Sequence, residues 1–191
     1  MKTLAYLALV GLVTSFTAQA AERQHGAHEH GAGKLNLAQE KDEVEIELEV
    51  PGDDIVGFEH AAKTDADRRA VDAAIKKLKD GASLFRFPAA AGCKLKEAEV
   101  AVHAEGEEGH GHKHEAKEGE HKHEKGKEAE GGHNEFHAHY HFQCANPAAA
   151  SPLDVQIFAV FPSTQKLTVQ AISPRGQNAA TLTPQHHRFD F

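Results

Sequence analysis

A segment near the middle of the chain, residues 103–133, contains no Val, Ile, Leu, Phe or Tyr. It holds seven His, nine Glu, five Lys and seven Gly instead. A segment without large apolar side chains cannot bury enough surface to offset the conformational entropy lost on ordering, so we expect a disordered loop. Any core must form from the two flanking parts of the chain, which makes this segment an insert within one domain.

The two cysteines of the chain, Cys93 and Cys144, stand on either side of this insert. Two cysteines in an exported chain usually pair, and this disulfide would close a loop of about 50 residues. Strand patterns follow Cys93 at 94–102 and lead up to Cys144 at 136–144. If the cysteines face each other in an antiparallel ladder, the disulfide clamps the base of a hairpin whose tip is the insert. The alternative is thiolate ligation of a metal, which an oxidising compartment disfavours.

The first 20 residues predict export. Lys2 precedes an apolar stretch at 4–13, and Ala18-Gln19-Ala20 is a small-x-small cleavage site. We therefore expect a signal peptide over 1–20, cleaved after Ala20, followed by a single domain over 21–191. No stretch reaches the roughly 18 apolar residues of a membrane span.

Hydrophobic patterns outside the insert predict an α+β fold with an antiparallel sheet and one or two helices. Within residues 44–50, apolar residues at the even positions alternate with glutamates at the odd positions. This alternation is typical of a half-buried strand with an acidic solvent face. We expect a short helix capped by Asp53 or Asp54, and a longer helix that begins after Thr64 and stops at Gly81. Further strands are expected at 34–38, 153–161, 166–172, 181–183 and 188–191.

Three of the 16 histidines, His137, His139 and His141, alternate along the strand expected at 136–144. Alternate strand residues share a face and lie about 6.6 Å apart along the backbone. The positions between them are mostly apolar, so the histidines take the solvent face. Imidazole suits Zn²⁺, Cu²⁺ and Ni²⁺, and neighbouring rings can converge on one ion. We predict this triple as the best pre-formed metal site, the alternative being three solvated residues in a polar pattern.

The other candidate ligands lie in the insert, in an N-terminal arm and at one isolated position. Sites in the insert should be numerous and individually weak, because binding must overcome loop ordering. The alternatives are a solvated linker for the insert and a surface or capping role for the isolated histidine. The candidates are His110, His112, His114, His121 and His123 in the insert, His25, His28 and His30 in the arm, and His60.

Composition favours Zn²⁺ and excludes several function classes. Cu(I) prefers thioether and thiolate ligands, but the only Met is the initiator and both cysteines are expected to be oxidised. Ni²⁺ and Cu²⁺ are the next candidates after Zn²⁺, and metal binding should weaken below about pH 6.5 as imidazoles protonate.

A net charge of −8 disfavours nucleic acid as a partner. The chain lacks H-E-x-x-H and G-x-S-x-G motifs, so we expect no enzyme.

Short motifs spread along the chain resemble those of one family. They are HGAHEHG at 25–31, PGDDIVGFEH at 51–60, AGC at 91–93, FQC at 142–144, GQ at 176–177 and LTP at 182–184. Together with the His-rich insert, they resemble the ZrgA family of periplasmic zinc-uptake proteins of Gram-negative bacteria. The resemblance implies a periplasmic zinc-binding protein, made under zinc starvation, that assists uptake alongside a transporter. It adds weight to His28, His30 and His60, which lie inside matching motifs, and by analogy it implies a homodimer.

Two other functions stay open from the sequence. A periplasmic buffer or detoxification protein for excess Zn(II), Cu(II) or Ni(II) would need the same ligands. A protein-interaction module recruited through the insert would need no metal.

Overall fold

The computed structural model describes residues 29–104 and 133–191. The expected signal peptide, most of the N-terminal arm and nearly all of the insert lie outside these residues. The main sheet has six strands in the order β4-β5-β2-β1-β7-β8. All neighbours are antiparallel except β1 and β7, which run parallel. The strands are β1 (Ala32–Glu40), β2 (Glu43–Pro51), β4 (Cys93–Ala104), β5 (Asn134–Cys144), β7 (Lys166–Ser173) and β8 (Gly176–Leu182).

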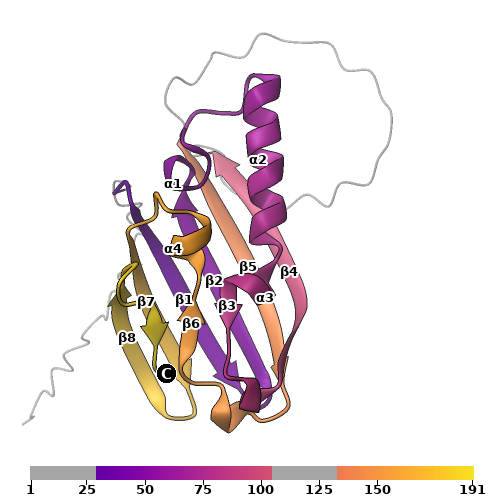
Figure 1. Cartoon of the computed structure of the whole chain (residues 1–191), viewed down its shortest axis with the longest axis vertical. Helices are drawn as coiled ribbons and strands as arrows, with labels where there is room; N and C mark the ends of the chain where they lie inside the picture. Colours follow the sequence, from indigo (N-terminus) through magenta and orange to yellow (C-terminus); the bar gives the residue numbers. More distant parts are fainter. Residues whose placement is uncertain (1–28, 105–132) are drawn as a thin grey trace, which may run out of the picture.

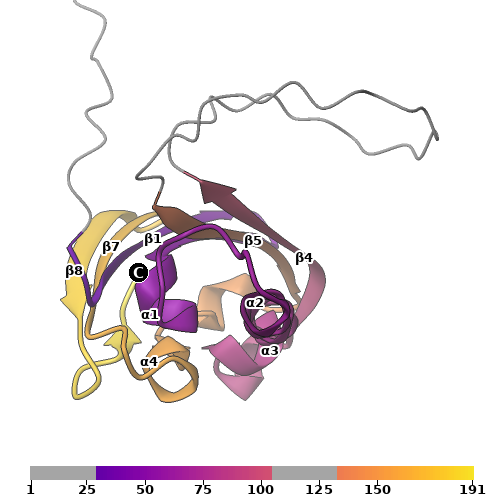
Figure 2. The ribbon, with the colours of Figure 1, turned by 90° about the horizontal axis from the view of Figure 1, so that it is seen from above.

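Four short helices and a second sheet cover one face of the main sheet. Figure 1 shows the elements in order, and Figure 2 shows the helices inside the hollow of the curved main sheet. The second sheet has the antiparallel order β3-β6-β9. These elements are α1 (Gly52–Val56), α2 (Asp65–Leu78), α3 (Gly81–Leu84), α4 (Ile157–Val160), β3 (Phe85–Arg86), β6 (Leu153–Val155) and β9 (Arg188–Phe189), with 3₁₀ turns at Ala89–Ala91 and Pro147–Ala149.

The predicted α+β fold is confirmed, although the described residues form four helices rather than one or two. Within residues 29–104 and 133–191, none of these helices combines the length and apolar character that crossing a bilayer requires.

Alternating burial on β2 and β5 builds the centre of the core. The apolar residues of the predicted 44–50 strand are buried, and its glutamates lie on the opposite, outer face. On β5, Phe136, Tyr140 and Phe142 are buried in the same way. The Tyr140 hydroxyl donates a hydrogen bond to the carbonyl oxygen of Leu78 at 2.9 Å, which joins β5 to the end of α2. Burial raises the pKa of this phenol.

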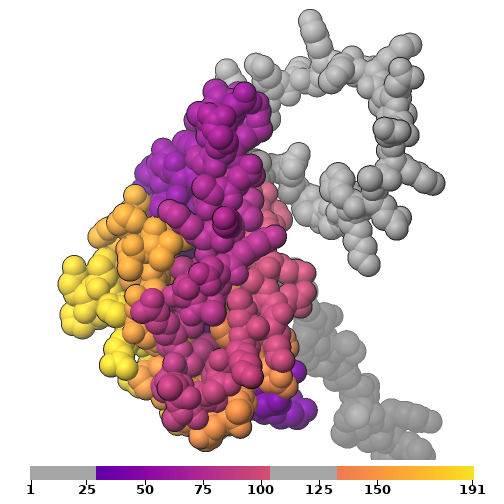
Figure 3. All heavy atoms as spheres, turned by 45° about the vertical axis from the view of Figure 1, so that its right-hand side comes forward, coloured from indigo at the N-terminus to yellow at the C-terminus, as the bar shows by residue number. Residues whose placement is uncertain are grey.

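Helix α2 begins as the sequence predicts. The Thr64 hydroxyl accepts a hydrogen bond from the Asp67 N–H at 3.1 Å, and the Asp67 carboxylate accepts one from the Thr64 N–H at 2.9 Å. This reciprocal capping box holds the pKa of Asp67 below its usual range. Buried Ala74 and Leu78 fix the helix on the sheet. In Figure 3, α2 and the segment after it cover the flank of the molecule beside β4.

The disulfide-clamped hairpin is confirmed. Cys93 and Cys144 are register partners in β4 and β5 and form a disulfide. The ladder continues, with one irregularity near Leu95, to the pair Ala104 and Asn134. The two ends of the insert therefore leave the body from adjacent strands.

The expected cap of α1 is wrong. The N-cap residue is Pro51, and no side chain caps the helix. Asp53 and Asp54 lie two and three positions after this cap, inside the first turn. Their charges still suit the positive helix N-terminus, which explains their place in the sequence.

The role expected for Gly81 is also wrong. Helix α2 already ends at Leu78, and Gly81 begins α3. A Cβ at this position would lie 2.5 Å from Cδ1 of Tyr140, so the glycine is required by close packing. The last two expected strands shift as well: 181–183 overlaps the end of β8, and 188–191 shortens to β9.

The single strand expected at 153–161 is interrupted. Strand β6 stops at Val155, and the Gln156 N–H donates to the carbonyl oxygen of Leu84 at 2.8 Å. The chain then turns into α4, which buries Phe158 in the core. A continuous apolar run is compatible with a strand or with a buried helical turn. Here its first part forms β6 and its second part forms α4.

Replacing both Cys93 and Cys144 by Ala should lower the free energy of unfolding by about 2–4 kcal/mol, because the unfolded chain regains the entropy of an open loop. Urea unfolding of the variant and of oxidised and reduced wild type measures this effect. A variant as stable as the oxidised protein would contradict the expected stabilisation.

Candidate metal-binding surfaces

Three histidines of β5 lie on the outer face of the main sheet, and we call His137, His139 and His141 the histidine row. Their side chains are 37%, 46% and 29% exposed, respectively. The apolar residues between them are buried in the core. The imidazoles thus reach solvent from a strand that is anchored on its other face.

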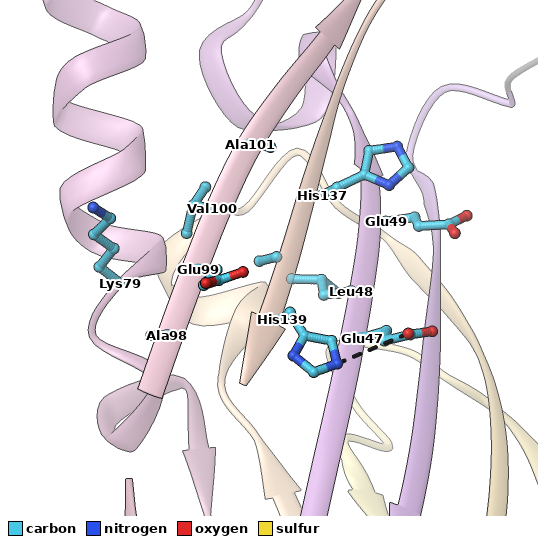
Figure 4. Close-up of a pocket in the computed structure, with 11 residues that line it drawn as sticks. Glu47, Leu48, Glu49, Lys79, Ala98, Glu99, Val100, Ala101, His137 and His139 are labelled. Atoms are coloured by element: carbon cyan, nitrogen blue, oxygen red, sulfur yellow. Dashed lines mark ion pairs between the residues drawn. The ribbon is translucent and has the colours of Figure 1, made fainter. Parts of the chain in front are cut away.

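Glutamates of both neighbouring strands flank the histidine row. His139 Nε2 lies 3.9 Å from Glu47 Oε1, and His141 Nε2 lies 3.7 Å from Glu43 Oε1. Figure 4 shows the first of these pairs beside a surface hollow of about 780 Å³. The register partners of the row are Glu49, Glu47 and Glu45 on β2, and Ala101, Glu99 and Glu97 on β4.

The end of the histidine row nearest the insert carries a further imidazole. His103 on β4 lies edge-on to His137, with ring centroids 4.7 Å apart. His137 Nε2 shares a hydrogen bond of 2.6 Å with Glu135 Oε2. This bond raises the pKa of His137 above the usual 6.5, against burial, which lowers it. A proton therefore competes with a metal for His137 more strongly than it does for a free imidazole.

A second group forms where the loop after α1 meets the residues that lead into β1 and into β5. We call Glu59, His30 and His133, together with the neighbouring Asp53 and Asp54, the Glu59 junction. His30 Nε2 lies 3.0 Å from Glu59 Oε1, and His133 Nδ1 contacts Glu59 Oε2. The Glu59 side chain is 15% exposed. One largely buried carboxylate therefore meets an imidazole at each of its oxygens.

Hydrogen bonds to the backbone hold the parts of the Glu59 junction together. The Asn134 N–H donates to the carbonyl oxygen of Glu59 at 2.7 Å. The Gly31 N–H donates to Asp54 Oδ1 at 2.8 Å. Gly52 permits the close approach, since a Cβ there would lie 2.9 Å from the carbonyl oxygen of Asn134. The start of β1, the turn of α1 and the start of β5 are thus fixed relative to one another.

The predicted ligands fall into three groups in the structure. The histidine row lies on one face as expected, and His30 belongs to the Glu59 junction. His60 joins neither: its ring stacks on Phe58 at 4.6 Å, and its Nδ1 lies 2.9 Å from the carbonyl oxygen of Ala61. Outside the described residues lie His25, His28, His110, His112, His114, His121 and His123.

Sequence reasoning missed Glu59 and Glu135 and assigned His103 and His133 to the insert. No periodicity marks Glu59, because its contact with His133 spans 74 positions. Its only signal is its place inside the 51–60 motif. Among the described residues, no three His, Cys, Asp or Glu side chains stand ready to hold a metal ion. The imidazoles instead pair with carboxylates, and they must turn when an ion binds.

An α+β domain with imidazoles and carboxylates gathered on one sheet face and at one end is typical of a protein that binds transition-metal ions. The chain belongs to the ZrgA family of zinc uptake proteins, whose family model matches residues 27–191. The resemblance seen in the sequence is confirmed, and membership implies zinc as the ligand. The family is described by zinc uptake and not by an enzymatic activity. A search of curated proteins found no match.

Glu135→Gln should lower the pKa of His137, because a neutral amide no longer favours the imidazolium. Ring-nitrogen NMR of metal-free protein measures this pKa directly. A raised histidine pKa stabilises the fold below the unfolded-state value of 6.5, and this is lost as pH rises through the folded-state value. The variant should therefore lose stability mainly at acidic pH. Glu40→Gln, on an exposed strand end, is the control, and an unchanged His137 titration in Glu135→Gln would refute the assignment.

Proposed function

We propose that this protein captures Zn(II) in the periplasm and assists its uptake through a partner transporter. The observation that carries the proposal is the histidine row with glutamates on both flanks, in a chain of a zinc uptake family. Imidazole nitrogen suits Zn²⁺, and the carboxylates add attraction for cations and spare oxygen ligands. The formal net charge of −8 acts in the same direction.

The accessibility of the histidine row supports capture rather than permanent retention. A structural zinc site is closed by four protein ligands, whereas an exchanging site keeps an open position. The row presents partly exposed imidazoles next to exposed Glu43, Glu45 and Glu47. An ion can therefore enter and leave without unfolding any part of the core.

The proposed location rests on the leader and the disulfide. Residues 1–20 have the composition of a signal peptide cleaved after Ala20, which leaves one zinc-binding domain over 21–191. The Cys93–Cys144 disulfide suits the oxidising periplasm. The transporter partner and the homodimer remain predictions from family resemblance.

The triple variant His137→Ala/His139→Ala/His141→Ala should bind fewer Zn²⁺ ions, with affinity at the row reduced by at least about tenfold, which corresponds to 1.4 kcal/mol. Calorimetric titration near pH 7.4 measures both quantities. Gln170→Ala, on the same outer face in β7, is the matched control. Unchanged stoichiometry and affinity in the triple variant would exclude the row as a zinc site.

Replacing residues 105–132 by a short Gly/Ser linker tests the capture role proposed for the insert histidines. We expect the weak zinc sites to disappear and growth under zinc limitation to suffer, because the segment holds a dense set of imidazoles. The melting temperature should change little, since the segment carries no large apolar side chains. If both stoichiometry and zinc-limited growth were unchanged, this role would be wrong.

A further inference from the structure

Two buried carboxylate oxygens at the Glu59 junction accept no hydrogen bond from the described residues. They are Oδ2 of Asp54 and Oε1 of Glu59. Asp54 is only 4% exposed, and its other oxygen accepts the Gly31 N–H. Glu59 Oε1 lies within ion-pair distance of His30 Nε2 but outside hydrogen-bonding geometry. Buried polar atoms are nearly always paired, so these two call for a missing partner.

The surroundings of these oxygens identify that partner as a cation. Asp53, Asp54 and Glu59 bring three carboxylates to the junction. Among the described residues, the ion pairs of Asp53 and Glu59 are with His30 and His133, which are charged only when protonated. Burial raises the pKa of Asp54, and the charges of Asp53 and Glu59 raise it further, against the Gly31 hydrogen bond. With neutral imidazoles the junction has an excess of negative charge.

The two ring nitrogens of His30 face two different carboxylates, as is common for a histidine that binds a metal. Its Nε2 faces Glu59, while its Nδ1 lies 3.7 Å from Asp53 Oδ2. At this distance Asp53 makes no hydrogen bond to the ring, but a carboxylate near the far nitrogen makes the near nitrogen a better donor to a metal. His133 presents Nδ1 to the other Glu59 oxygen. Each of the two Glu59 oxygens thus faces one imidazole nitrogen.

We propose that the Glu59 junction is a zinc site, in which the Glu59 carboxylate, His30 Nε2 and His133 Nδ1 bind one Zn²⁺. Asp53 lies near the far nitrogen of His30, and Asp54 supplies buried negative charge. The inference rests on the proposed function for the identity of the ion and deepens it by naming a site separate from the histidine row.

One of the two pairs already has nearly the spacing that zinc requires, whereas the third ligand has to turn before all three can bind one ion. Donor atoms on a tetrahedral zinc, at bond lengths of about 2.0–2.2 Å, lie roughly 3.3 Å apart. The 3.0 Å between His30 Nε2 and Glu59 Oε1 needs to widen by only a few tenths of an ångström. Three protein ligands leave a fourth position open, which suits an ion that is to be handed on.

The decisive variants are Glu59→Gln and Asp54→Asn, made in the full protein. Chelator competition measures the tightest zinc affinity, and ring-nitrogen NMR follows His30 and His133. We expect Glu59→Gln to weaken the tightest site at least about tenfold and to abolish the zinc-induced shifts of both rings. Glu40→Gln, an exposed carboxylate at the other end of β1, should bind zinc like wild type.

Asp54→Asn separates a ligand site from a structural ion pair. Asparagine keeps the oxygen that accepts the Gly31 N–H and removes the buried charge. Metal-free Asp54→Asn should therefore melt at a higher temperature than wild type, and zinc should raise its melting temperature less. Asp72→Asn, on the exposed side of α2, is the matched control for both measurements.

The possible failures are distinguishable. If Glu59→Gln bound zinc like wild type and only lowered the melting temperature, the junction would be a structural ion pair and the inference would be overturned. If the tightest site disappeared only in the triple variant of the histidine row, the inference would fail while the proposed function stood. Wild-type protein that bound no zinc would overturn both.

Discussion

The antiparallel register of β5 between β2 and β4 is the constraint on which the rest of the structure depends. Side chains alternate across a strand, so a shift by one residue would turn the histidine row into the core and Tyr140 into solvent. The Cys93–Cys144 disulfide fixes this register at one end of the hairpin. At the other end, Asn134 is hydrogen-bonded to the loop after α1. The same register thereby positions both candidate metal-binding surfaces.

The two surfaces present similar ligands at different energetic cost. In the histidine row, imidazoles and glutamates meet in contact with solvent, where an ion pair contributes little and side chains move freely. At the Glu59 junction, Asp54 and Glu59 are largely buried, and two of their oxygens have no hydrogen-bond partner among the described residues. Such an arrangement destabilises the metal-free fold and favours a cation. Natural proteins commonly keep this kind of local conflict where function requires it.

How far the sequence could predict the structure depended on whether the cause was local. Alternation at 44–50, the Thr64 capping box and the hairpin register each arise from neighbouring residues or from one strand pair, and they are confirmed. The role of Gly81 was predicted wrongly because the glycine is required by close packing against Tyr140, which is far away in the sequence. Glu59 was missed for the same reason, since its partners lie at the ends of β1 and β5. Long-range proximity leaves no periodic trace in the chain.

Chain connectivity places the Glu59 junction at the point where the insert returns to the body, and the histidine row begins beside the point where the insert leaves it. The insert leaves the body at Ala104 and returns at His133, which is itself part of the junction. The insert histidines, from His110 to His123, are each within about twelve residues of one of these two ends, so covalent reach limits them to about 40 Å from their attachment points. An ion bound anywhere in the insert is therefore held at high local concentration near the junction. In the roles that we propose, capture by the insert and retention at the junction would be successive steps along one continuous chain.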